Sequence, residues 1–196
     1  MSLVRTKDIS IYYEKSSKKK NGPLLYISGS GGDLRNKPNH FDSPLAEYFE
    51  VIGYDQRGLG QTSKPEGIYT MQQYADDAAY LLDSLGLNRV PVVGVSFGGM
   101  VAQEFAIRHP NKVSKLVLCC TSSGGKGGSS YPLHELEGFE SNERLEKSLR
   151  INDVRLTDSW IRENPKQWSQ LKEELSNTYN VRDTDSGKYD SSAGKI

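Results

Sequence analysis

The sequence lacks an excess of charge of either sign. Its 196 residues hold 25 lysine and arginine residues against 25 aspartate and glutamate residues, so the formal net charge is zero. Proteins that bind nucleic acid, or the surface of an anionic membrane, work through clustered positive charge. The balanced charge therefore predicts that this protein does not bind nucleic acid and is not a polybasic protein of the membrane surface.

Long hydrophobic runs are also absent. No apolar stretch of the sequence approaches the roughly 18 residues of a membrane-spanning helix. The first ten residues, MSLVRTKDIS, lack the apolar segment of a signal peptide. We therefore expect a cytoplasmic protein with no membrane partner, and the length is that of one sizeable domain with a small appendage.

Cysteine is scarce, with only two residues, Cys119 and Cys120. Adjacent residues on a strand point to opposite faces of a sheet, so a disulfide between these two would be strained. The sequence predicts two buried free thiols. Nothing in it indicates an oligomeric state.

Apolar residues are unevenly distributed. They concentrate in residues 1–121, whereas residues 122–196 are poorer in apolar and richer in charged residues. We expect a core over 1–121, then a flexible Gly/Ser linker with a partial helical cap over 122–181. The last stretch, 182–196, has almost nothing to bury and is expected to be disordered.

The core alternates apolar runs with helical periods, which is typical of an α/β fold with a mostly parallel sheet. Residues 9–14 alternate and are expected to pair with the first residues as a hairpin. Four further strands are predicted at 23–27, 50–54, 90–95 and 116–120, the last two buried on both faces. Helices are predicted from Thr70, with Gln73 completing a capping box, and over 97–108. Shorter helices are expected at 142–151, 157–163 and 165–179.

The strongest motif is Gly94-Val95-Ser96-Phe97-Gly98, which matches G-x-S-x-G. It lies directly after a predicted strand and directly before a predicted helix, the context in which this motif forms a nucleophile elbow. A serine on so sharp a turn has a strained backbone and an exposed hydroxyl, and flanking glycines let the chain pass without Cβ clashes. The alternative is the Gly-rich turn of a nucleotide-binding unit, but the glycine spacing fits neither motif of that kind.

Three other segments occur in the order typical of one family. The sequence reads Ile27-Ser-Gly-Ser-Gly-Gly32, then Asp55-Gln-Arg-Gly-Leu-Gly-Gln-Thr62, and after the elbow helix His109-Pro110 leading into an apolar strand. With the elbow, these segments resemble an α/β-hydrolase of the esterase, enol-lactonase and C–C hydrolase type. The resemblance covers residues 1–121 and reaches into the family's cap region.

The resemblance implies roles for particular residues. Ser96 would be the nucleophile, and the backbone amides of Ser30 and Phe97 would form the oxyanion hole. Its implied substrate is a small ester, lactone or related carbonyl compound, with no cofactor and no metal. Asp55 and Arg57 would form a local ion pair that holds their loop.

A serine triad also needs a base and an acid, which in this family follow later strands. The chain has only three histidines. We expect His40 at the surface and His109 as a helix cap. His134 lies at the start of the cap-like part rather than after a final strand, and it is the alternative as a substitute base. The sequence therefore predicts that the chain is truncated before its triad acid and histidine. The alternative is a non-catalytic α/β-hydrolase-like binding protein that has lost turnover.

Overall fold

The computed structural model describes residues 2–17, 19–123 and 133–185. The chain divides into two compact units, with the boundary after Ser130. The predicted linker 122–130 falls mostly outside the described residues, as does most of the predicted end 182–196.

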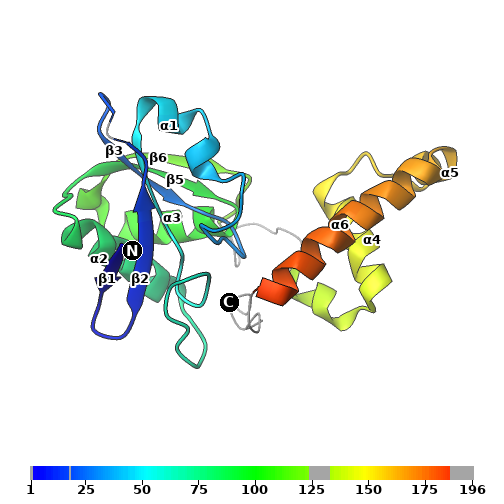
Figure 1. Cartoon of the computed structure of the whole chain (residues 1–196), viewed down its shortest axis with the longest axis horizontal. Helices are drawn as coiled ribbons and strands as arrows, with labels where there is room; N and C mark the ends of the chain where they lie inside the picture. Colours follow the sequence, from blue (N-terminus) through cyan, green and yellow to red (C-terminus); the bar gives the residue numbers. More distant parts are fainter. Residues whose placement is uncertain (1, 18, 124–132, 186–196) are drawn as a thin grey trace. The chain divides into compact units, whose positions relative to one another are not determined.

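The first unit is built on one six-stranded sheet (Figure 1). Its strands are β1 Leu3–Arg5, β2 Ser10–Lys15, β3 Pro23–Ile27, β4 Glu50–Tyr54, β5 Val90–Val95 and β6 Val113–Cys119. They lie in the order β1-β2-β4-β3-β5-β6. The first two strands are antiparallel, and β4, β3, β5 and β6 are parallel. The predicted α/β class and the N-terminal hairpin are both confirmed.

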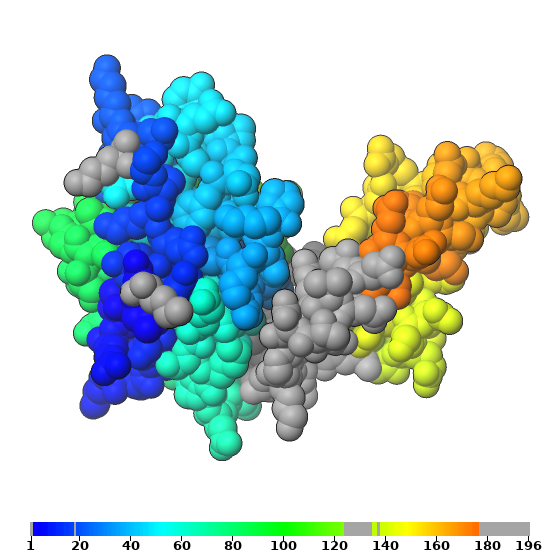
Figure 2. Space-filling model, in the orientation of Figure 1, coloured from blue at the N-terminus to red at the C-terminus, as the bar shows by residue number. Residues whose placement is uncertain are grey.

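Helices cover both faces of this sheet. The helical elements are η1 His40–Asp42, α1 Leu45–Tyr48, α2 Met71–Ser84, α3 Phe97–Arg108 and η2 Pro110–Lys112. The larger core joins α2 and α3 to one face of the strands, through residues such as Tyr74, Phe105 and Ile52. The smaller core joins η1 and α1 to the other face around Val51 and Val93. Figure 2 shows the light-blue and cyan segment that carries η1 and α1 as one packed block.

The two predicted long helices of the core are confirmed, and so are the residues predicted to begin α2 and to end α3. Thr70 accepts a hydrogen bond from the amide of Gln73, whose side chain accepts one from the amide of Thr70. This capping box satisfies amides that the first turn of α2 would otherwise leave unpaired. The helix α3 ends at Arg108, with His109 as its C-cap before Pro110, because the residue before a proline is disfavoured in the helical region.

Strand β6 departs from the prediction of a strand buried on both faces. Leu116, Val117 and Leu118 are 37%, 48% and 42% exposed. Among the described residues β6 pairs only with β5, so it is an edge strand. The apolar sequence of β6 predicted a central strand, but apolar residues alone do not determine how many neighbours a strand has. The prediction of two buried thiols was wrong for the same reason: Cys119 is half-buried and Cys120 is exposed, and both are free.

The second unit is helical. Its elements are η4 Leu133–Gly138, α4 Ser141–Asn152, α5 Asp158–Glu163 and α6 Pro165–Asp185. Thr157 caps α5 by accepting from the amide of Trp160, and Trp168 is buried. The helix α6 continues to Asp185, beyond the predicted end at residue 179. None of the helices over the described ranges is long and apolar enough to cross a membrane.

Candidate active site

Ser96 stands at the turn between β5 and α3. Its backbone has φ 54° and ψ −123°, a strained conformation for a residue with a side chain. Ser96 is exposed, and its side chain makes no capping hydrogen bond to the helix that follows. The strained turn predicted from the motif is therefore confirmed, with the serine at the carboxyl end of a parallel strand.

The two glycines of the motif are required by close packing. A Cβ on Gly94 would lie 2.5 Å from the carbonyl oxygen of Gly98 and 2.7 Å from Cβ of Ala102. A Cβ on Gly98 would overlap the carbonyl oxygens of Ile27 and Ser28. The absence of side chains at these positions lets α3 start directly against β5 and β3.

Strand β6 secures the turn from its other side. The amide of Ser96 donates to the carbonyl of Cys119 at 2.9 Å, and the hydroxyl of Thr121 donates to the carbonyl of Ser96 at 2.7 Å. A Cβ on Gly99 would come within 2.5 Å of the Thr121 side chain. Thr121 is a contributor that the sequence did not single out, because its contact spans 25 residues of chain.

The loop that follows β3 lies beside the elbow. A Cβ added to Gly29 would stand 3.2 Å from Cβ of Ser96 and 3.8 Å from its Oγ. The amide of Gly32 donates to the carbonyl of Gly29 at 3.2 Å, which closes a turn around Ser30. Ser30 is exposed, as Ser96 is. The structure thus brings the Ser28–Gly32 loop and the Ser96 turn together.

Two backbone amides at this place are unpaired within the part of the chain that the structure describes. Neither the amide of Ser30 nor that of Phe97 donates a hydrogen bond there. The amide of Phe97 belongs to the first turn of α3, where the helix dipole adds positive potential. Unpaired amides next to an exposed serine are the groups that can receive a developing negative charge on oxygen.

The predicted ion pair between Asp55 and Arg57 is wrong. The Asp55 carboxylate accepts hydrogen bonds from the amides of Leu34 at 2.8 Å and Gln61 at 2.7 Å. Arg57 turns instead to Asp77 on α2, with two hydrogen bonds of 2.7 Å. Burial raises the pKa of both carboxyl groups, against the lowering effect of these donors. The family resemblance implied the pair, but in the structure the two side chains bind different partners.

His40 is buried, which contradicts the prediction that it lies at the surface. Its ring stacks on Tyr26 at 4.5 Å between centroids, and a Cβ on Gly53 would overlap its Nε2. The glycine of β4 therefore makes the room in which the ring is buried. Burial, followed by the charge of Lys37, lowers the pKa of His40 to about 4.

No histidine side chain contacts Ser96 in the described residues. His109 caps α3 as predicted, and its Nε2 lies 2.8 Å from the Asp76 carboxylate. His134 belongs to η4 in the second unit, and its side chain falls outside the described residues. The described residues of the first unit therefore place no histidine base at Ser96.

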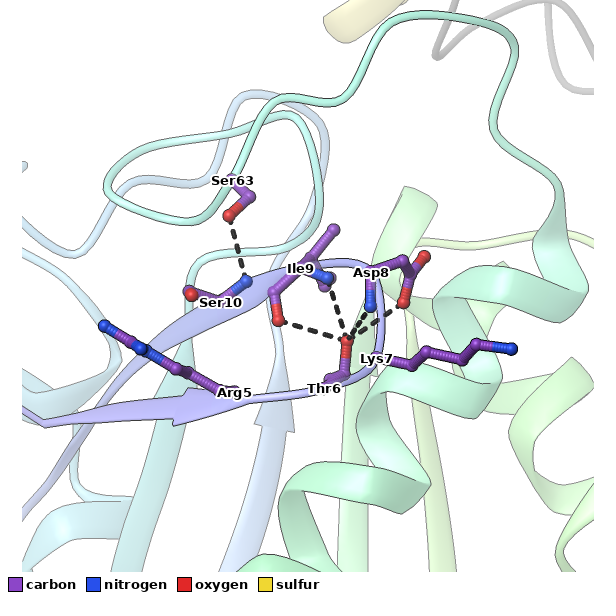
Figure 3. Close-up of a pocket in the computed structure, with 7 residues that line it drawn as sticks. All are labelled: Arg5, Thr6, Lys7, Asp8, Ile9, Ser10 and Ser63. Carbon is purple, nitrogen blue, oxygen red and sulfur yellow. Dashed lines mark hydrogen bonds between the residues drawn. The ribbon is translucent and has the colours of Figure 1, made fainter.

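A separate hollow of about 250 Å³ lies at the turn between β1 and β2 (Figure 3). Its walls include none of the elbow or Ser28–Gly32 residues; they are Arg5, Thr6, Lys7, Asp8, Ile9, Ser10 and Ser63. The Arg5 and Lys7 side chains point away from one another. The Thr6 hydroxyl is already bonded to the turn, including the amide of Ile9 at 2.9 Å, so the hollow offers no converging set of free polar groups.

Among the described residues, no group of three or more histidine, cysteine, aspartate or glutamate side chains could hold a metal ion.

The sequence matches the profile of the α/β hydrolase fold family over residues 22–175. This match covers more than half of the chain and includes the elbow, the loop after β3 and much of the helical unit. The chain belongs to the α/β hydrolase fold family.

Two curated relatives are enzymes by name. The chain is 39% identical over 102 residues to a poly(3-hydroxyalkanoate) depolymerase of Ectopseudomonas oleovorans, covering 52% of this chain and 36% of the relative. It is 37% identical over 116 residues to a 2-hydroxymuconate semialdehyde hydrolase of Pseudomonas sp. strain CF600, covering 58% and 39%. The chain thus spans well under half of the length of these relatives.

Among solved structures, a hydrolase from Pseudomonas aeruginosa matches 98% of this chain and 69% of its own, with a TM-score of 0.65 and 26% identity. The enol-lactonase of Burkholderia xenovorans LB400 matches 88% of this chain at a TM-score of 0.61 and 22% identity, which shows the shared fold alone. The relatives support hydrolase activity as the function of the family to which the chain belongs.

Proposed function

We propose that this chain carries the nucleophile and oxyanion hole of a serine hydrolase that acts on a small ester, lactone or related carbonyl compound. Ser96 attacks the carbonyl carbon through Oγ, and the oxygen that becomes negative is received by the amides of Ser30 and Phe97. The observation that carries the proposal is the exposed, strained Ser96 beside the loop of Ser30, with the amides of Ser30 and Phe97 unpaired among the described residues.

The proposal assigns the triad acid and histidine to sequence outside this chain. Oγ of Ser96 must lose a proton as it attacks, and the described residues of the first unit give it no basic partner. The aligned relatives extend well beyond the matched region, which supports a longer hydrolase. The lack of a base also keeps the second candidate open, a non-catalytic protein that binds the same carbonyl compounds without turnover.

Labelling with a fluorophosphonate separates these candidates. We expect slow covalent labelling at one site, which peptide mapping places on Ser96 and which is lost in Ser96→Ala. Ser114→Ala is the matched control, because Ser114 is also exposed but lies within regular strand β6. A chain that remains unlabelled, or labelling that persists in Ser96→Ala, contradicts the hydrolase and leaves the binding protein.

A further inference from the structure

Gln56 is a buried polar residue that the proposed chemistry does not use. It follows β4 and has 0% exposure. Its Nε2 donates a hydrogen bond of 2.8 Å to the carbonyl of Ser28. Its Oε1 is buried and has no partner among the described residues.

The unpaired oxygen makes the carboxamide an unfavourable choice for a core position. An apolar side chain of similar length would fill the space without burying an unpaired acceptor. What the amide adds is the hydrogen bond to Ser28. The amide of Gln56 therefore acts on the position of Ser28.

Ser28 lies where the chain leaves β3 and enters the loop beside Ser96. On one side, its carbonyl accepts from Gln56. On another, the same oxygen lies so close to the first turn of α3 that a Cβ on Gly98 would overlap it. The carbonyl is thus fixed between the end of β4 and the start of the elbow helix.

Fixing this carbonyl also fixes the path of the backbone through the residues that follow. The peptide unit is planar, so the orientation of the Ser28 carbonyl sets that of the Gly29 amide and the direction in which the chain proceeds to Ser30. Gly29 is the loop residue beside Ser96. A rotation of this peptide would move the Ser30 amide relative to Oγ of Ser96.

We propose that Gln56 is a positioning residue for the oxyanion hole. Its carboxamide holds the Ser28 carbonyl and thereby keeps the amide of Ser30 turned toward the carbonyl compound at Ser96. It touches no reacting atom and acts through the loop. The inference rests on the proposed function, in which the Ser30 amide receives the negative charge.

The variant Gln56→Met tests the tether, because methionine keeps the length and removes the donor. We expect amide hydrogen exchange over residues 28–32 to accelerate about tenfold or more, measured by mass spectrometry. Thr62→Val is the control. Thr62 is also buried near the end of β4, where its hydroxyl donates to the carbonyl of Asp55 at 2.6 Å and accepts from the amide of Tyr12 at 2.8 Å, and among the described residues it makes no hydrogen bond to residues 28–32. Exchange over 28–32 should stay unchanged in this control.

A second readout follows the chemistry. In fluorophosphonate labelling we expect Gln56→Met to lower the maximal rate at Ser96 about tenfold, with the half-saturating probe concentration within about twofold. Thr62→Val should change neither. If Gln56→Met loses the circular dichroism of the fold, Gln56→Asn replaces it, since the shorter side chain withdraws the amide from Ser28.

The outcomes separate the two claims. Unchanged exchange over 28–32, or an unchanged maximal rate in a folded Gln56 variant, overturns the positioning role. An equal acceleration of exchange in Thr62→Val also overturns it, because the effect would then be general loosening. Absence of labelling in the unsubstituted chain overturns the proposed function, while the exchange experiment still decides whether Gln56 tethers the loop.

Discussion

At the scale of single residues, the elbow depends on the absence of a side chain at Gly98. The backbone of β3 occupies the space into which a Cβ there would project, through the carbonyls of Ile27 and Ser28. Backbone carbonyls of a central strand cannot move aside as the tip of a flexible side chain can. The first turn of α3 would have to shift instead.

We therefore expect Gly98→Ala to lower the free energy of unfolding by about 1–3 kcal/mol, the usual cost of overpacking. It should also abolish labelling of Ser96. Urea unfolding followed by circular dichroism measures the first effect. Gly138→Ala, at a position with nothing within 4 Å of the added Cβ, should change stability by no more than about 0.5 kcal/mol. If the two substitutions lowered the free energy of unfolding equally, the packing of α3 against β3 at Gly98 would not be too close for a side chain.

His40 gives the fold a dependence on acidity. Its ring is buried against Tyr26 and Gly53, and its Nε2 has no partner among the described residues. Burial and then the Lys37 charge lower its pKa to about 4, although Asp42 acts in the opposite direction. The neutral ring is therefore the form that the fold accommodates.

The unfolded chain binds a proton at His40 below its ordinary pKa of 6.5, whereas the folded chain does so only near pH 4. Stability is thus fully retained above pH 6.5 and falls as the pH is lowered toward 4, by on the order of 3 kcal/mol from this group. His40→Phe, which keeps a ring against Tyr26, should flatten this part of the profile. Urea midpoints measured from pH 4 to 7 test it, and an unchanged slope in the variant would contradict the assignment.

At the scale of elements, the segment after β4 is attached to α2 by a buried ion pair. Arg57 and Asp77 are both nearly inaccessible to solvent and share two hydrogen bonds. Asp8 lies 3.5 Å from the same guanidinium but is largely exposed. Most of the compensation for burying the Arg57 charge therefore comes from Asp77.

Removing only one partner should be more harmful than removing both. We expect Asp77→Ala to lower the free energy of unfolding by about 3–5 kcal/mol, because it leaves a buried charge uncompensated. The double variant Arg57→Met with Asp77→Leu should recover most of that loss. Denaturant titration of the single and double variants measures the difference. A double variant less stable than Asp77→Ala would contradict this account.

The elements themselves could be predicted because their signals are local. The Thr70 capping box, the proline after His109 and the glycines around Ser96 each act within a few residues, and the structure places helices and strands where they indicated. The partners of Arg57 and the burial of His40 could not be predicted in this way. Both depend on residues brought near by folding, Asp77 in one case and Gly53 in the other.

At the scale of the whole molecule, β6 leaves apolar side chains exposed. The sequence showed an apolar strand but could not show how many neighbours it has. Leu116, Val117 and Leu118 lie on both sides of a strand whose outer edge has no partner in the described residues. Exposed edges of this kind favour pairing between chains.

We expect the chain to self-associate with increasing concentration, as measured by sedimentation or light scattering. Val117→Lys should reduce the association without changing circular dichroism, because a charge on an edge strand opposes pairing. Ile107→Lys is the matched control, since Ile107 is 75% exposed but lies on α3. Association that stays unchanged in Val117→Lys, or falls equally in both variants, would show that β6 is not the contact.

We propose that Ser96 and its oxyanion hole have no base among the described residues, and ester hydrolysis with added imidazole tests this most directly. The rate to compare is that of the chain minus that of Ser96→Ala, with p-nitrophenyl acetate as substrate. We predict a difference close to zero in plain buffer that grows with imidazole concentration, because free imidazole can take the proton for which the described residues offer Ser96 no acceptor. A large difference without imidazole would mean that the chain already holds a base. No difference at any imidazole concentration would mean that Ser96 is not a nucleophile.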